Sequence, residues 1–229
     1  MKNAITVIFF TLLFTIAGCK MDGPESPPEP IVEPKFFTML ERDTITSGSY
    51  LGMEILEKAE KTYEVLQSLR ETHDLDYLNV VSNISSDISK LNNRIPLYSY
   101  LLLDERKGTD SGVQITIENE KVKAIYLNSG KALNQWPANA KTESSVRIGD
   151  AVESIYAKLV NIYNKGTYAN KFEYIALQTK NVAASFDPVM AQLPQWYFMR
   201  KTGPGLWEEV QVNLKNGVLD NIVVIRYSE

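Results

Sequence analysis

Few side chains of this chain have the chemistry of a catalytic or metal-binding group. The 229 residues include one cysteine, Cys19, and one histidine, His73. A single cysteine excludes an intramolecular disulfide, and a zinc site built from cysteine and histidine needs several such ligands. A nucleophile activated by histidine would have to use His73, which lies in a polar stretch after a predicted helix. We therefore expect no metal site, no cofactor and no catalytic residue of these kinds.

The remaining candidates for acid–base chemistry are the carboxylates Asp104, Glu105 and Asp110. General acid–base catalysis needs two carboxylates held at a fixed separation in a cleft, with their pKa values pushed apart. Neighbouring positions in a predicted turn over residues 104–112 do not establish that separation, so a solvated loop is the favoured interpretation. A carboxylate-dependent hydrolase acting on glycan or peptide remains an alternative function.

The surroundings of Cys19 indicate an export signal. Lys2 precedes an apolar run from Ala4 to Ile16, which has the length of a signal-peptide core and is short for a membrane span. The run ends in Ile16-Ala17-Gly18-Cys19. An aliphatic residue, two small residues and a cysteine in this order resemble a bacterial lipoprotein signal.

That resemblance implies cleavage between Gly18 and Cys19, so that residues 1–18 are the signal peptide and Cys19 becomes the lipidated first residue. Several acyl chains hold a domain at a membrane far better than one chain does. Lys20 stands where a signal for inner-membrane retention has aspartate. We therefore expect an outer-membrane protein, anchored by lipid on the periplasmic or the cell-surface face. An ordinary secretory signal with an incidental cysteine is the alternative.

Residues 19–43 are predicted to be the lipidated N-terminus and a tether. The stretch from Asp22 to Pro34 carries five of the chain's ten prolines. Proline fixes φ and removes a hydrogen-bond donor, which favours an extended, semi-rigid spacer. A loop packed on the folded part is the alternative structure.

Two similar stretches, 97 positions apart, predict β-hairpins at residues 113–127 and 210–225. Amphipathic helices are predicted at the same offset, over residues 49–69 and 150–163. The pair Leu51-Gly52 before the first helix matches Ile148-Gly149 before the second. These matches predict a duplication, with repeat one at 44–130, a connector at 131–142 and repeat two at 143–229.

The predicted fold class is α+β, with two tandem repeats that each pack a helix on an antiparallel sheet of about four strands. Such an arrangement resembles the β-lactamase-inhibitor-protein-like superfamily. The pairs Leu51-Gly52 and Ile148-Gly149 are also similar to a motif in small lipoproteins of the outer-membrane assembly machinery. These resemblances imply protein binding through a concave sheet, or scaffolding at the envelope.

Aromatic residues on the predicted strands and their loops are the candidate binding surface. Alternate strand residues point to opposite faces, so Trp196 and Phe198 share one face and Tyr197 takes the other. One face could stack on a glycan or anchor a protein partner, or it could simply form the core under the helix. The candidate residues are Tyr98, Tyr100, Trp196, Tyr197, Phe198 and Trp207.

The charge pattern gives no support for nucleic-acid binding, because the formal net charge is −4 and no basic stripe is present. The favoured function is a non-enzymatic envelope lipoprotein. It would contact the membrane through lipid on Cys19 and present a binding surface to a protein or glycan partner, a protein being favoured. Besides the hydrolase, a structural spacer without a ligand is an alternative.

Overall fold

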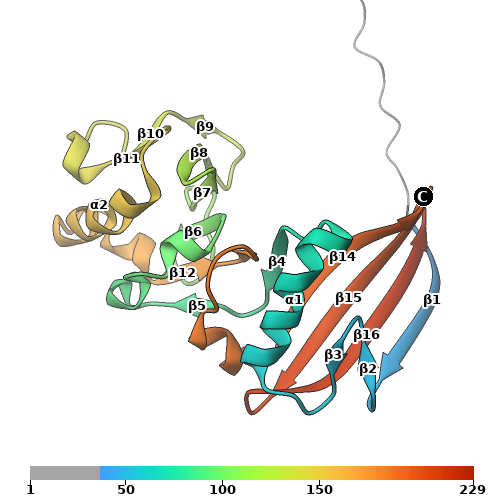
Figure 1. The fold of residues 1–229 in the computed structure, drawn as a ribbon. Helices are drawn as coiled ribbons and strands as arrows, with labels where there is room; N and C mark the ends of the chain where they lie inside the picture. The colour runs from blue at the N-terminus through green and yellow to red at the C-terminus, as the bar shows by residue number, and fades with distance from the viewer. Residues whose placement is uncertain (1–36) are drawn as a thin grey trace, which may run out of the picture. The chain divides into compact units, whose positions relative to one another are not determined.

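Two six-stranded antiparallel sheets organise residues 37–229, the part of the chain that this computed structural model describes (Figure 1). The first sheet has the order β1-β16-β15-β14-β4-β13. Its strands are Thr38–Ile45 (β1), Val218–Ser228 (β16), Leu206–Lys215 (β15), Gln195–Gly203 (β14), Tyr77–Val80 (β4) and Thr179–Asn181 (β13). The predicted signal peptide, Gly18, Cys19 and the proline-rich stretch lie outside the described residues.

The second sheet has the order β5-β12-β6-β7-β8-β9. Its strands are Ile84–Ser85 (β5), Tyr174–Leu177 (β12), Tyr100–Asp104 (β6), Val113–Glu118 (β7), Lys121–Leu127 (β8) and Ala132–Leu133 (β9). Two short pairs of strands stand apart: Ser49–Tyr50 (β2) with Met53–Glu54 (β3), and Gln135–Trp136 (β10) with Val146–Arg147 (β11).

The α-helices of the described residues are Ala59–His73 (α1) and Val152–Asn164 (α2). The described residues also form short 3-10 helices: Ile88–Leu91 (η1), Ile95–Leu97 (η2), Thr142–Ser144 (η3), Ala169–Phe172 (η4) and Pro188–Gln192 (η5). No helix in residues 37–229 combines the length and apolar character that a membrane crossing requires.

The two predicted hairpins are confirmed. The first forms β7 and β8, and the second forms β15 and β16. Asn216 and Gly217 connect the second pair, and both have positive φ, at 53° and 80°. Positive φ at both central residues is the geometry that matches the right-handed twist of the flanking strands.

The prediction of two consecutive repeats, each with a helix on its own sheet, is wrong. The described residues are mostly β, with 42% in strands and 24% in helices. Each large sheet mixes segments from both predicted repeats, since β4 joins β13–β16 and β12 joins β5–β9. In addition, residues 38–45, mostly assigned to the tether by the sequence, form the edge strand β1. The hydrophobic pattern defines the faces of a strand but leaves its partner to tertiary packing.

Each helix also packs against the other half of the sequence. Helix α1 contacts η5 and β16, and α2 contacts η1 and η2. Both helices begin at the tip of a hairpin from the opposite half. The backbone N–H of Ala59 donates to the carbonyl of Gly217, and that of Val152 donates to the carbonyl of Glu120, each at 2.9 Å.

The contacts between helix starts and hairpin tips, called helix–hairpin junctions below, show that the predicted alignment of the two helices is wrong by four positions. Buried positions Ala59, Thr62 and Leu66 of α1 correspond to Val152, Ile155 and Leu159 of α2, which lie 93 positions later rather than 97. Leu56 therefore takes the place of Gly149. The N–H of Leu56 donates to Leu219 and that of Gly149 to Val122, both at 2.8 Å. The predicted partner, Leu51-Gly52, is instead the turn between β2 and β3.

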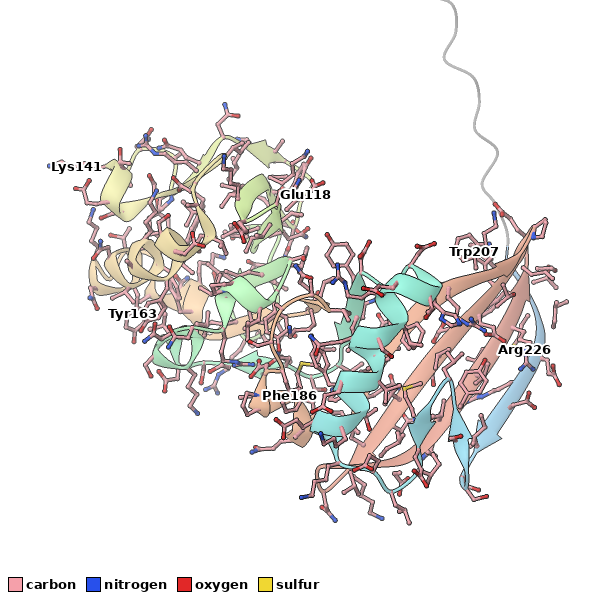
Figure 2. All side chains as sticks on the ribbon, in the orientation of Figure 1. Glu118, Lys141, Tyr163, Phe186, Trp207 and Arg226 are labelled. Carbon is pink, nitrogen blue, oxygen red and sulfur yellow. The ribbon has the colours of Figure 1, made fainter. Side chains whose placement is uncertain are left out.

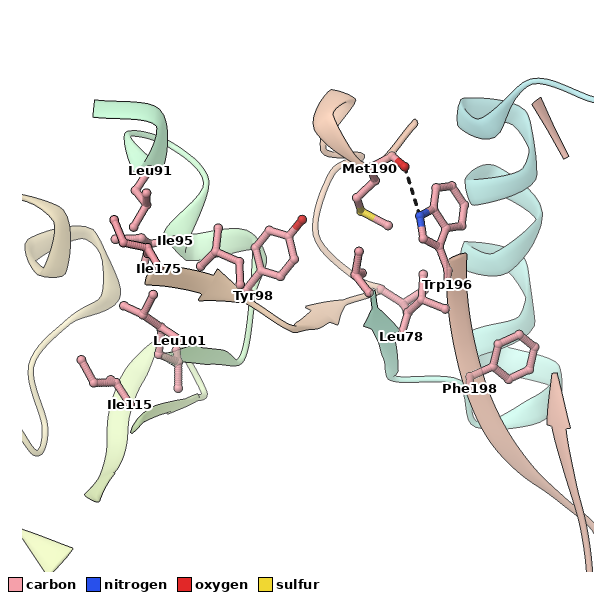
Figure 3. Close-up of a cluster of buried hydrophobic side chains, with 14 of the residues drawn as sticks. Leu78, Leu91, Ile95, Tyr98, Leu101, Ile115, Ile175, Met190, Trp196 and Phe198 are labelled. Carbon is pink, nitrogen blue, oxygen red and sulfur yellow. Dashed lines mark hydrogen bonds between the residues drawn. The ribbon is translucent and has the colours of Figure 1, made fainter. Parts of the chain in front are cut away.

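A single hydrophobic cluster runs through both sheets. Under α1, the ring of Tyr63 lies edge-on to Trp196 at 6.3 Å between centroids. The indole N–H of Trp196 donates to the carbonyl of Met190 at 3.2 Å, so this buried donor is satisfied (Figure 3). Leu101, Ile115 and other residues of β6 and β7 continue the cluster on the second sheet.

Leu56→Gly is expected to raise the free energy of unfolding by about 0.5–1 kcal/mol. Leu56 has a φ of 73°, which strains a residue with a Cβ, and its side chain is 75% exposed, so little burial is lost. Urea denaturation followed by circular dichroism measures the change.

The matched control is Gly149→Leu at the corresponding junction, where φ is 87°. No atom outside its immediate neighbours lies within 4 Å of the position of an added Cβ. Backbone strain is then the main cost, and a loss of about 1–2 kcal/mol is expected. Equal destabilisation by both substitutions would contradict the assignment of Leu56 as the strained counterpart of Gly149.

Candidate binding surface

Three of the six aromatic candidates lie in the core. Tyr98, Trp196 and Phe198 are 1%, 0% and 2% exposed, so they do not line an open surface. Tyr197 alternates with Trp196 and Phe198 in β14, and Tyr100 alternates with the buried Leu101 in β6, so both face away from the core and are partly exposed. Tyr98 does not share the face of Tyr100, because it precedes β6. The structure therefore separates these aromatic residues into a buried set and a set that faces solvent.

Trp207 lies in a different part of the first sheet. It lies near the N-terminal end of β15 (Figure 2), opposite Tyr227 near the C-terminal end of β16. The ring of Phe37 meets Trp207 edge-on at 6.0 Å and Tyr227 at 6.2 Å. This cluster closes the end of the first sheet and shares no hollow with Tyr100 or Tyr197.

Tyr197 and Tyr100 each border a hollow where the two sheets meet. The Tyr197 hollow has a volume of about 250 Å³, and Tyr174 of β12 and Asn79 of β4 also line it. The Tyr100 hollow has a volume of about 350 Å³, and its lining includes Tyr77 of β4. Residues from both sheets line each hollow, so neither sheet alone would form it.

One row of cross-strand neighbours connects the two hollows. Tyr197 pairs with Asn79, and Asn79 pairs with Thr179, which lines the Tyr100 hollow. The hydroxyl of Thr179 donates to the side chain of Asn79 at 3.3 Å. We call this surface the junction valley. It consists of Tyr77, Asn79, Tyr100, Tyr174, Gln178, Thr179 and Tyr197.

The junction valley offers hydrogen-bonding groups that are not already engaged. The hydroxyls of its four tyrosines, and the amide of Gln178, make no hydrogen bond to another described residue. Burial raises the pKa of Tyr100, so its hydroxyl stays a neutral donor at physiological pH. Among the residues lining the two hollows, the one charged side chain is Glu118, which pairs with Lys123 at 3.3 Å.

A buried lysine supports the valley from behind. Lys180 is 0% exposed and neighbours Thr179 in β13. Its ammonium donates to the carbonyl of Asn181 at 2.8 Å and lies 5.1 Å from the ring centroid of Tyr63 and 5.9 Å from that of Tyr98. Cation–π contact with two rings offsets part of the cost of burying the charge. Because Lys180 points inward, Thr179 must face the valley.

An ion pair next to this lysine fixes Tyr98. Asp187 is buried, accepts a hydrogen bond from the Tyr98 hydroxyl at 2.6 Å, and pairs with Arg94 at 2.9 Å. The backbone of Tyr98 also bridges to Lys180. Tyr98 therefore anchors the start of β6, two residues before Tyr100, to the first sheet. Its role is to position the valley.

The loop over residues 104–112, which contains Asp104, Glu105 and Asp110 and is called the acidic loop below, is a turn held by its own hydrogen bonds. Asp104 is buried and accepts hydrogen bonds from the backbone and hydroxyl of Thr109 and from the amide of Asn128. Burial alone would raise the pKa of Asp104, but these bonds, with that from the backbone of Glu105, outweigh it and lower the pKa. Lys171 is also buried and pairs with Glu105 at 2.9 Å. A carboxyl group that stays ionised in such a network is a poor general acid.

The carboxylate of Glu208, on the inner face of the first sheet, is also held in a network of hydrogen bonds. Its carboxylate accepts hydrogen bonds from Tyr50 at 2.9 Å, Arg200 at 2.8 Å and Arg226 at 3.0 Å. Burial opposes these bonds, yet the pKa of Glu208 is lowered. This carboxylate serves to close the end of the sheet.

Sequence reasoning missed most of the valley. Tyr174 lies on β12, Asn79 on β4, and Gln178 between β12 and β13. The sequence pattern of a half-exposed strand does not show which other strand its exposed face will meet. The alternation of Tyr174, Ala176 and Gln178 with Ile175 and Leu177 was the available signal.

Comparison of the chain with protein-family models, with curated proteins and with solved structures finds no significant match.

Lys180 is expected to make stability rise with pH between about 8 and 10. Burial lowers the pKa of Lys180 from 10.5 to about 8, against the attraction of Asp187. The unfolded chain then holds more protons than the folded chain in this window, so raising the pH favours folding. Above about 10 the trend reverses, because burial raises the pKa values of Tyr63 and Tyr98 from 10.0.

The measurement is urea denaturation at pH 7.5, 8.5 and 9.5 for the native chain and Lys180→Met. The native chain should gain about 1–2 kcal/mol relative to the variant over this range. The exposed Lys201→Met should track the native chain and serves as control. Parallel pH profiles for all three proteins would show that the folded-state pKa of Lys180 is not lowered.

Proposed function

We propose that this protein is a lipid-anchored, non-enzymatic binding protein of the bacterial outer membrane, and that its partner contacts the junction valley. Two features support the proposal. The Ile16-Ala17-Gly18-Cys19 sequence resembles a lipoprotein signal and would place the folded part at a membrane surface. The valley then presents partly exposed tyrosines and an amide with free hydrogen-bonding groups.

The observation that carries the proposal is the contrast between the valley and the acidic clusters. In the valley, four tyrosine hydroxyls and the side-chain amide of Gln178 have no hydrogen-bond partner among the described residues. Asp104 and Glu208, by contrast, are fully engaged in ion pairs and hydrogen bonds, with lowered pKa values. Free polar groups beside aromatic rings favour ligand binding, whereas paired carboxylates favour structural roles.

The other two functions lack a comparable observation. A carboxylate-dependent hydrolase would be supported by two facing acids of raised pKa. The carboxyl groups with a resolved shift in the described residues, Asp87, Asp104 and Glu208, all have a lowered pKa. A spacer without a ligand would be supported by a featureless surface, which the hollows at the sheet junction do not resemble.

Cys19→Ala is expected to abolish lipid anchoring at the outer membrane, because no acyl chains can be attached. Density-gradient fractionation of cells should find the protein missing from the outer-membrane fraction, and its higher mass on a gel should show that the signal peptide is still attached. Lys20→Asp is the matched control, since it keeps the cysteine and should leave lipidation intact while redirecting the protein toward the inner membrane. An unchanged outer-membrane location of Cys19→Ala would refute the anchor.

A photo-crosslinking residue at position 197 is expected to form a covalent adduct with an envelope component in intact cells. The same residue at position 163, an exposed tyrosine on α2, is the control, because Tyr163 lies outside the valley. Gel shift and mass spectrometry compare the two. Equal adducts at both positions, or none at position 197, would count against the valley as the binding surface.

A further inference from the structure

We propose that the junction valley takes an extended glycan chain without charge. The inference rests on the proposed function, since it names the ligand class of the same surface. Three observations support it: the charge of the lining, the order of the hollows along the valley, and the pairing of the strands that form it.

The lining of the Tyr197 and Tyr100 hollows has no lysine or arginine that would attract an acidic polymer. Residues of the Tyr197 hollow are uncharged, and the Glu118 of the Tyr100 hollow is paired with Lys123. A nucleic acid or an acidic polysaccharide is bound by lysine and arginine that neutralise its charge. A ligand without charge is the best match for this lining.

The valley is segmented along its length rather than shaped as one deep pocket. The valley ends at Tyr174, beyond which a third hollow of about 320 Å³, also bordered by Tyr174, is lined by the charged residues Asp104, Glu105, Arg106 and Lys107 of the acidic loop. The row of Tyr197, Asn79 and Thr179 then leads to the Tyr100 hollow. Two hollows of about 250 and 350 Å³, each bordered by tyrosines and connected by this row of strand neighbours, suit a chain of repeated units better than a compact ligand.

The side chains match the two surfaces of a sugar ring. A pyranose has apolar C–H faces and a rim of hydroxyls, so it can stack on an aromatic ring while it donates and accepts hydrogen bonds at its edge. Tyr100, Tyr174 and Tyr197 supply rings with free hydroxyls, and Gln178 supplies a free amide. Each of these groups can serve one sugar hydroxyl without breaking a bond within the described part of the protein.

The backbone of the valley is closed to a peptide that would add a strand. β4 lies between β14 and β13, β12 lies between β5 and β6, and β6 lies between β12 and β7. The edge strand β5 has two residues, and the N–H of one of them, Ile84, already donates to the carbonyl of Ser82 at 2.9 Å. The carbonyl of Thr179, on the edge strand β13, already accepts from the N–H of Ser99 at 2.7 Å. Strand addition needs an unpaired edge, so an extended peptide lacks its usual main-chain contacts here.

The test is affinity gel electrophoresis of the lipidated full-length chain in a zwitterionic detergent that carries no sugar headgroup. Gels contain one of four neutral polysaccharides, namely a β-glucan, an α-glucan, a xylan or a mannan, or one of two acidic ones, polygalacturonate or hyaluronan. At least one neutral gel should retard the protein, and 0.5 M salt should leave the retardation unchanged, because no ion pair contributes.

Substitutions locate the binding in the valley. Tyr197→Ala and Tyr100→Ala are each expected to weaken retardation about tenfold, as loss of a stacked ring does. Tyr126→Ala is the matched control, because Tyr126 is exposed on the second sheet and lines neither hollow. Tyr197→Phe keeps the ring and the fold and should weaken binding less than Tyr197→Ala. Thermal unfolding confirms that each variant is folded.

The outcomes separate this inference from the proposed function. Retardation by acidic gels alone, lost at high salt, would overturn the neutral ligand. No retardation in any gel, together with a protein adduct at position 197 in cells, would overturn the glycan and leave the binding function standing. Neutral binding that Tyr197→Ala and Tyr100→Ala do not weaken would place the glycan elsewhere and refute the inference.

Discussion

The antiparallel pairing of residues 77–85 with residues 174–181 joins the two sheets. At one end of this ribbon β4 pairs with β13 in the first sheet, and at the other β5 pairs with β12 in the second. Between them, Val80 donates to Gln178 and Leu177 donates to Asn83. Because one strand of the pair comes from each half of the sequence, neither sheet can be completed without both halves. The exchange of the two helices follows from the same constraint.

The ribbon also explains why two consecutive residues face the valley. In β12, Ile175 and Leu177 belong to the core and Ala176, although buried, borders the Tyr197 hollow, whereas in β13 the buried residue is Lys180. Odd-numbered residues point into the core in β12, whereas an even-numbered residue does so in β13. Gln178 and Thr179, at the change between the two sheets, therefore both face the valley. The inward residue of β13 is thus Lys180, whose ammonium is unfavourable to bury. The rings of Tyr63 and Tyr98 and the nearby carbonyls stabilise it. The core on one side and the candidate site on the other thus share their supporting groups.

The candidate site could be predicted from the sequence only in part. Alternation places Tyr197 opposite to Trp196 and Phe198, and the structure agrees that these residues point to different faces. Nothing in the alternation says which face is core, and Trp207 belongs to an aromatic cluster at the far end of its sheet. Tyr174 and Asn79 could not be found at all, because they become neighbours only through contacts nearly a hundred residues apart in the chain.

The sequence by itself determined the local elements. Alternating apolar residues and the Asn216-Gly217 turn specify a hairpin, and apolar residues at three- and four-residue spacing specify α2. These signals depend on interactions between near neighbours. Only the tertiary structure decided which helix lies on which hairpin, and that Leu56 rather than Gly52 stands where Gly149 does. Strand partners and helix docking are chosen by burial over the whole chain, which leaves no periodic trace at any one position.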